Sequence, residues 1–129
     1  MEERRKRLLV VEDETPIARV LALHLSSVGY EVEAVGTGNA AVTYAAGHSI
    51  DLVLLDLRLP DMDGYDVCKQ LRKSHTSWDL PIVMVTALDQ PANQLRGFAH
   101  GADAYITKPF HLSEICETVA LLLGETSAT

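Results

Sequence analysis

The sequence predicts an α/β domain with a doubly wound, five-stranded parallel sheet. Three observations carry this prediction: short apolar runs alternate with segments of helical periodicity, the alternation repeats five times, and glycine or proline marks most of the boundaries. Right-handed crossovers between parallel strands place the connecting helices on both faces of such a sheet. The pattern alone leaves the order of the strands open.

Five segments have the length and composition of strands. Leu52–Leu55 is the most informative, because an uninterrupted apolar run of this length is typical of a strand buried on both faces. The predicted strands cover residues 8–11, 30–35, 52–55, 81–85 and 104–106.

The first two helices follow the first two strands. Thr15 is the expected N-cap of the first helix and Gly29 its stop. Residues at i, i+3, i+4 and i+7 give this helix an apolar face, which consists of Ile17, Val20, Leu21, His24, Leu25 and Val28. A turn at 36–39 then leads into a second helix of small residues over 40–46.

Three further helices complete the pattern. The third should bury Val67, Cys68 and Leu71 and direct Lys69, Arg72 and Lys73 into water. The fourth should begin with Asp89 as its cap and end near His100, and Gly97 in its interior should make it the least stable helix. The fifth should bury Leu112, Ile115, Val119 and Leu122 and end before Gly124.

Length and composition indicate one globular domain. We expect a basic tail over 1–7, the folded domain over 8–124, and a polar tail or cut linker over 125–129. The formal charge of −7 argues against generic nucleic-acid binding, and no apolar run approaches the ~20 residues of a membrane span. Cys68 and Cys116 lack metal-ligand spacing, so free thiols and a cytoplasmic location are expected.

Polar side chains follow four of the predicted strands. They are Glu12-Asp13, Asp56, Thr86 and Lys108. Because the carboxyl ends of parallel strands meet at one edge of the sheet, these groups should converge in one shallow pocket. The sequence therefore predicts a site with three carboxylates, one hydroxyl and one ammonium.

The chemistry of this site favours a phosphoryl group. Converging carboxylates repel one another unless a cation intervenes, and oxygen ligands without cysteine or histidine suit Mg²⁺ better than zinc. Lys108 supplies a compact positive charge for an anionic oxygen. Asp56 could then act as the covalent nucleophile, giving an aspartyl phosphate, although a lone aspartate at a strand end can also be a simple cap.

In combination these motifs resemble the receiver domains of two-component response regulators, similar to the single-domain chemotaxis-type receivers. The resemblance covers about residues 8–123. It depends on four motifs in order: Glu12-Asp13, Asp56 with Pro60 and Gly64 downstream, Thr86-Ala87, and Lys108-Pro109. It implies the flavodoxin-like strand order 2-1-3-4-5, which is typical of such receivers.

The resemblance also implies a role for each site residue. Asp56 would accept a phosphoryl group from a histidine kinase or a phosphotransfer protein. Asp13, Asp56 and the backbone carbonyl of Arg58 would bind Mg²⁺, and Glu12 would act through a coordinated water. Lys108 and Thr86 would contact phosphoryl oxygens, and the Lys108-Pro109 peptide bond would be cis.

The implied output is a shift between conformations. Thr86 would move inward with Tyr105, the family's switch aromatic, although Tyr105 can also be a plain aromatic at the sheet edge. The face made by the fourth helix, fifth strand and fifth helix would then bind a downstream partner, an effector domain or a second copy.

Two rival functions use similar residues. A phosphatase of the haloacid dehalogenase type needs a second aspartate two residues after the nucleophile, where this chain has Arg58. A pseudo-receiver, which binds partners without phosphorylation, usually lacks one of the motif residues that this chain retains. We therefore expect a phospho-acceptor rather than an enzyme. Arg58 and Leu88 occupy positions that influence phosphoryl lifetime in the family, and their effect stays open.

Overall fold

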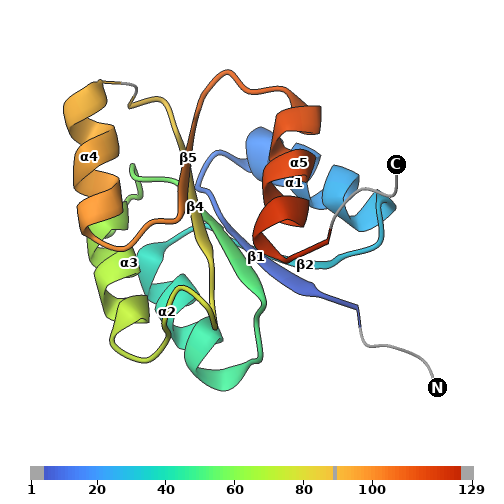
Figure 1. Ribbon diagram of the computed structural model, residues 1–129, viewed down its shortest axis with the longest axis horizontal. Helices are drawn as coiled ribbons and strands as arrows, with labels where there is room; N and C mark the ends of the chain where they lie inside the picture. The colour runs from blue at the N-terminus through green and yellow to red at the C-terminus, as the bar shows by residue number, and fades with distance from the viewer. Residues whose placement is uncertain (1–4, 89, 126–129) are drawn as a thin grey trace.

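The computed structural model describes residues 5–88 and 90–125 and confirms the doubly wound α/β fold (Figure 1). Five parallel strands form one sheet in the order β2-β1-β3-β4-β5, as the resemblance implied. The strands are β1 (Arg7–Val11), β2 (Glu31–Val35), β3 (Leu52–Leu55), β4 (Ile82–Thr86) and β5 (Ala104–Thr107). Their bounds differ from the predicted ones by at most one residue at either end.

Five helices connect and follow the strands. They are α1 (Thr15–Ser27), α2 (Gly38–Gly47), α3 (Gly64–Arg72), α4 (Pro91–Ala99) and α5 (Leu112–Leu122). In Figure 1, α1 and α5 cover one face of the sheet, and α2 and α3 lie on the other with α4 beside α3. Within the described residues, no helix is long and apolar enough to cross a membrane.

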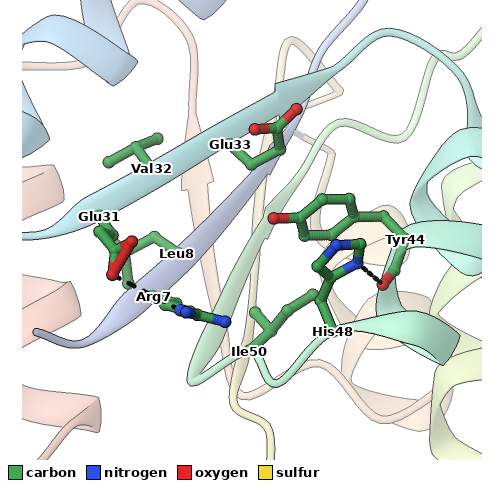
Figure 2. A pocket seen from close by; sticks show the side chains of 8 residues that line it. All are labelled: Arg7, Leu8, Glu31, Val32, Glu33, Tyr44, His48 and Ile50. Carbon is green, nitrogen blue, oxygen red and sulfur yellow. Dashed lines mark hydrogen bonds and ion pairs between the residues drawn. The ribbon is translucent and has the colours of Figure 1, made fainter. Parts of the chain in front are cut away.

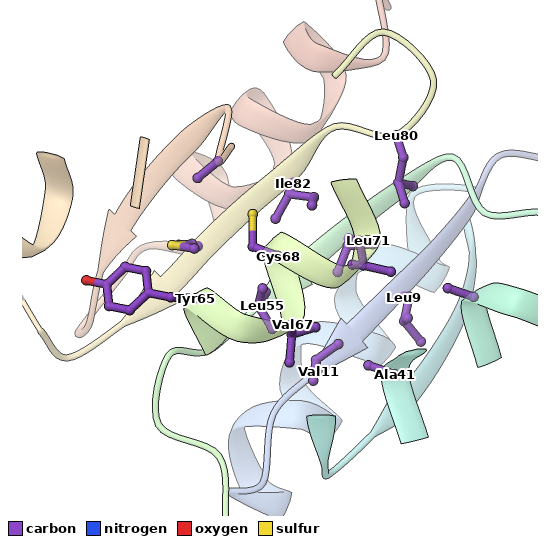
Figure 3. Close-up of a cluster of buried hydrophobic side chains, with 14 of the residues drawn as sticks. Leu9, Val11, Ala41, Leu55, Tyr65, Val67, Cys68, Leu71, Leu80 and Ile82 are labelled. Carbon is purple, nitrogen blue, oxygen red and sulfur yellow. The ribbon is translucent and has the colours of Figure 1, made fainter. Parts of the chain in front are cut away.

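The sheet divides the apolar core into two clusters. Leu9, Val53 and Leu55 face α2 and α3, where Val67, Cys68 and Leu71 pack against them (Figure 3). The alternate strand residues Leu8, Leu52 and Leu54 face α1 and α5, and meet Leu21, Leu25, Ile115 and Val119. Strand β3 is therefore buried on both faces, as predicted from its uninterrupted apolar run.

The predicted start and apolar face of α1 need correction. Glu14 rather than Thr15 occupies the N-cap position, and Thr15 is the first helical residue. Val20 and Val28, expected in the buried face, are 47% and 52% exposed. The buried face of α1 contains Ala18, Leu21 and Leu25, which share one side of the helix, while Val20 lies outside it and Val28 follows the last helical residue.

Helix α2 begins two residues earlier than predicted, at Gly38, because its first turn is capped from two sides. The Thr37 hydroxyl accepts a hydrogen bond from the backbone N–H of Ala40 at 3.0 Å. The Asp61 carboxylate, from the loop after β3, accepts the N–H groups of Gly38 and Asn39 at 2.8 Å each. Sequence reasoning missed this long-range cap.

Helix α4 begins after Gln90, which is its N-cap and makes no side-chain capping bond. Asp89, the predicted cap, lies outside the described residues. Gly97 is buried, and a Cβ at this position would lie 2.9 Å from the sulfur of Met84. The glycine that weakens the helix therefore allows α4 to approach the sheet closely.

Arg72 does not face water as predicted. Its side chain is 16% exposed and pairs with Asp103 at 2.7 Å. It also donates hydrogen bonds to the backbone carbonyls of Leu80 and Gly101. Arg72 thus joins the end of α3 to the segments before β4 and β5, whereas Lys69 and Lys73 are exposed as expected.

Candidate functional site: an acidic pocket at the carboxyl edge of the sheet

The register of β1 and β3 places two carboxylates side by side. Val11 pairs with Leu55, so the next residues, Glu12 and Asp56, leave the sheet together. The backbone N–H of Asp56 donates to the carbonyl of Val11 at 3.0 Å. Glu12 and Asp56 are 4% and 5% exposed, whereas Asp13 is exposed.

Local hydrogen bonds fix the two buried carboxylates. One Glu12 oxygen accepts the backbone N–H of Glu14 at 3.1 Å, and one Asp56 oxygen accepts the N–H of Arg58 at 3.0 Å. Behind Asp56, the N–H of Gly64 donates to the carbonyl of Leu57 at 2.9 Å. A Cβ on Gly64 would lie 2.5 Å from the Asp56 carbonyl oxygen, so only glycine allows α3 to start this close to the strand end.

The ammonium group of Lys108, which follows β5, bridges the two buried carboxylates. Its Nζ lies 2.6 Å from Glu12 Oε1 and 2.9 Å from Asp56 Oδ2. Glu14 Oε2 lies 3.2 Å from the same nitrogen, a contact that sequence reasoning missed although Glu14 directly follows the acidic pair. The Lys108-Pro109 peptide bond is cis.

The acidic groups could hold a metal ion. Glu12, Asp13 and Asp56 each offer a carboxylate oxygen, and these oxygens lie within 4.8 Å of one another. An all-oxygen donor set fits a hard divalent cation, so the residues present suit such an ion. Beside them lies a cavity of about 240 Å³, lined by Asp13, Glu14, Asp56, Arg58, Ala87 and Lys108.

Thr86 and Tyr105 both form a hydrogen bond with the backbone of Leu88. Thr86 is fully buried, and its hydroxyl accepts the N–H of Leu88 at 3.5 Å. The half-buried Tyr105 donates its hydroxyl to the carbonyl of Leu88, and its ring lies 6.5 Å from that of Phe98 on α4. The two predicted switch residues are therefore connected through a third, Leu88, whose backbone role has no signal in the sequence.

Comparison with known proteins decides the family. The family model described as the response regulator receiver domain matches residues 8–120. The chain belongs to this family. The acidic pocket formed by Glu12, Asp13 and Asp56 accordingly fits the Mg²⁺ and phosphoaspartate site of a receiver domain.

Two similar proteins are transcriptional regulators about twice as long as this chain. The probable transcriptional regulator ycf27 of Cyanophora paradoxa is 42% identical over 126 residues, which cover 98% of this chain and 52% of that protein. The DNA-binding dual master transcriptional regulator RpaA of Synechocystis sp. is 38% identical over 120 residues, covering 93% of this chain and 50% of that protein. The chain thus spans about half the length of these relatives.

Solved structures agree with this assignment. A CheY-like response regulator receiver domain protein from Methanospirillum hungatei superposes with a TM-score of 0.89 at 31% identity, covering 95% of this chain and 96% of that one. The response regulator TrrA from Thermotoga maritima, in complex with Mg²⁺ and BeF, has a TM-score of 0.80 at 34% identity, covering 91% of this chain and 98% of that one.

Burial and charge shift the pKa values of two groups in the pocket. Burial, reinforced by the charge of Asp56, raises the pKa of Glu12 to about 7, against the lowering effect of its bonds from Lys108 and Glu14. Burial alone would lower the pKa of Lys108, but its hydrogen bonds to Glu12 and Asp56 and their charges raise it above its usual range. Lys108 therefore stays an ammonium.

The receiver domain has a second cavity at the opposite, amino edge of the sheet, with a volume of about 200 Å³ (Figure 2). Arg7 and Glu31 enter it from the starts of β1 and β2, with Arg7 Nε 3.5 Å from Glu31 Oε2. The stacked rings of Tyr44 on α2 and His48, just after that helix, form its far wall. The opposite charges of Arg7 and Glu31 therefore face each other in this second cavity. Among the described residues, the group of acidic side chains that could hold a metal ion lies in the first pocket.

Proposed function

We propose that this receiver domain is a phospho-accepting signalling switch and that Asp56 is the accepting residue. The observation that carries the proposal is the position of Lys108 Nζ, 2.9 Å from Asp56 Oδ2 and 2.6 Å from Glu12 Oε1. A buried carboxylate beside an ammonium and an acidic cation site has the parts required for phosphoryl transfer, which depends mainly on alignment and charge neutralisation.

In the proposed reaction, a carboxylate oxygen of Asp56 attacks the phosphorus of a phosphohistidine. The donor belongs to a sensor histidine kinase or a phosphotransfer protein. As the new P–O bond forms, the P–N bond breaks, and the histidine nitrogen leaves with the electron pair of that bond. Lys108 donates to one phosphoryl oxygen and the Thr86 hydroxyl to another.

Mg²⁺ is the proposed cofactor, and it would supply positive charge to neutralise the phosphoryl oxygens. Asp13, Asp56 and the carbonyl of Arg58 would bind it directly, and Glu12 through a water. The clustering of Glu12, Asp13 and Asp56 oxygens supports this set, and Arg58 is adjacent because its N–H already bonds Asp56. The domain would accept and later lose its own phosphoryl group rather than act on separate substrates.

The proposed output surface is the face formed by α4, β5 and α5. Thr86 and Tyr105 both contact Leu88, so an inward movement of Thr86 toward a phosphoryl group would disturb the bond that holds Tyr105. On the same face, Leu95 and Phe98 of α4 are 70% and 46% exposed. This apolar surface would bind a downstream protein, an effector domain or, after phosphorylation, a second copy.

The two free thiols suit a reducing compartment, so we propose a cytoplasmic location. The domain itself would not bind nucleic acid, because the net charge of the chain is −7. The longer Synechocystis relative is a DNA-binding regulator, and DNA binding is a property of that protein.

Phosphorylation by a small phosphodonor tests the proposal. With acetyl phosphate and Mg²⁺, intact mass should show one added phosphoryl group, and Asp56→Asn should abolish it. Asp66→Asn is the matched control, because Asp66 is an exposed carboxylate on α3. Equal labelling of the Asp56→Asn variant would refute the assignment, and loss of labelling in the control would show that the assay reports something other than Asp56.

A further inference from the structure

The loop between β3 and α3 carries the residues nearest the phosphorylation site, and one carboxylate in it reaches away from that site. Asp61 directs one oxygen to the N–H of Gly38 and the other to the N–H of Asn39, both at 2.8 Å. These two donors are the first residues of α2, so Asp61 joins the loop to another helix across more than 20 residues of sequence. The same two bonds hold the pKa of Asp61 below its usual range, so the carboxylate is ionised.

The inner part of the loop is fastened to itself. Arg58 and Asp63 form an isolated antiparallel bridge, and Gly64 bonds back to Leu57. The outer part, beyond Pro60, is fastened to α2. Beside the Asp61 bonds, Met62 packs so closely on Gly38 that a Cβ there would lie 2.3 Å from the Met62 Cγ.

We propose that Asp61 is a positioning residue for the metal site, which holds the loop against α2 and thereby fixes the backbone of Arg58 beside Asp56. This inference rests on the proposed function, in which the Arg58 carbonyl is a metal ligand. Arg58 follows Asp56 by two residues and precedes Asp61 by three. A loop fixed at Asp61 leaves the Arg58 peptide little freedom to lose when a cation binds, and less ordering means tighter binding.

Thermodynamic linkage gives the proposal a second consequence. If the Asp61 bonds favour cation binding, then cation binding must strengthen those bonds by the same factor. The effect should be visible at the donors, the amide protons of Gly38 and Asn39, which lie on a different element from any proposed ligand.

The test compares Asp61→Ala with Thr37→Ala. Both changes remove a cap from the first turn of α2, because Thr37 accepts the N–H of Ala40. Asp61 alone also belongs to the loop after β3, so the pair separates a loss of helix stability from a loss of loop position. Both variants should lower the melting temperature, but only Asp61→Ala should weaken Mg²⁺ binding, by about tenfold in a calorimetric titration.

Amide exchange measured by NMR supplies the second readout. In the unaltered protein, Mg²⁺ should slow the exchange of the Gly38 and Asn39 amide protons, and this protection should disappear in Asp61→Ala. Asp61→Asn, which keeps one acceptor oxygen, should give an intermediate Mg²⁺ affinity.

The possible outcomes separate the two proposals. Unaltered Mg²⁺ affinity in Asp61→Ala, or an equal loss in Thr37→Ala, would overturn the positioning role and leave the proposed function intact. Failure of the unaltered protein to bind Mg²⁺ would overturn the proposed function together with this inference.

Discussion

Replacing Gly64 with alanine should damage both the stability of the domain and the reactivity of Asp56. The new Cβ would lie 2.5 Å from the Asp56 carbonyl oxygen and 2.6 Å from the Cα of Leu57. Both are backbone atoms that cannot rotate away, so β3 or α3 must shift. Overpacking of this kind costs about 1–3 kcal/mol. For the middle of that range we expect the melting temperature to fall by about 6–10 °C.

Thermal unfolding and the acetyl phosphate assay would measure the two effects of Gly64→Ala. Gly47→Ala is the matched control, because Gly47 is also helical and a Cβ there would have no neighbour within 4 Å. The control should be neutral or stabilise by up to about 1 kcal/mol, since alanine favours helix more than glycine does. An unchanged melting temperature and labelling rate in Gly64→Ala would refute the argument that this close approach fixes Asp56.

Two further predictions concern the ion pair of Arg72 and the protonation of Glu12. Arg72→Ala should lower the free energy of unfolding in urea by about 3 kcal/mol, because it leaves the partly buried Asp103 without its cation. The control Lys69→Ala, at an exposed position on the same helix, should change the free energy of unfolding by less than about 0.5 kcal/mol. Similar values for the two variants would contradict a stabilising role for the Arg72–Asp103 ion pair. Glu12 has its pKa raised from 4.5 to about 7, so without metal its stabilising contribution is complete below the unfolded pKa and is lost as the pH rises between these values. Because a metal site of this kind needs the carboxylate, Mg²⁺ should raise the melting temperature more at about pH 8 than at about pH 6, and an equal shift would count against Glu12 in the site.

Much of the fold follows from local signals in the sequence. The apolar run of β3 and its polar exit at Asp56 could be predicted because four consecutive apolar residues are too few for a buried helix and suit a strand buried on both faces. The convergence of Glu12, Asp56 and Lys108 could be predicted because parallel strands share one carboxyl edge. Strand order came only with the family resemblance.

The features that sequence reasoning missed depend on contacts between distant segments. Arg72 has the spacing of an exposed helix residue, but its side chain is held inward by hydrogen bonds to the backbone carbonyls of Leu80 and Gly101. Helix α2 starts early because Asp61, far along the chain, supplies acceptors for its first turn. Periodicity reports which face of a helix is apolar, but it carries no information about a partner that lies on another element.

The position of β2 at the edge of the sheet affects how copies of the chain can meet. An edge strand has a row of peptide groups without a neighbouring strand, which can pair with another molecule and start aggregation. Glu31 and Glu33 are both exposed on this strand, so two copies that approached through β2 would bring like charges together. Charge repulsion at this edge should therefore disfavour pairing of two copies through β2 and with it the growth of a sheet across molecules.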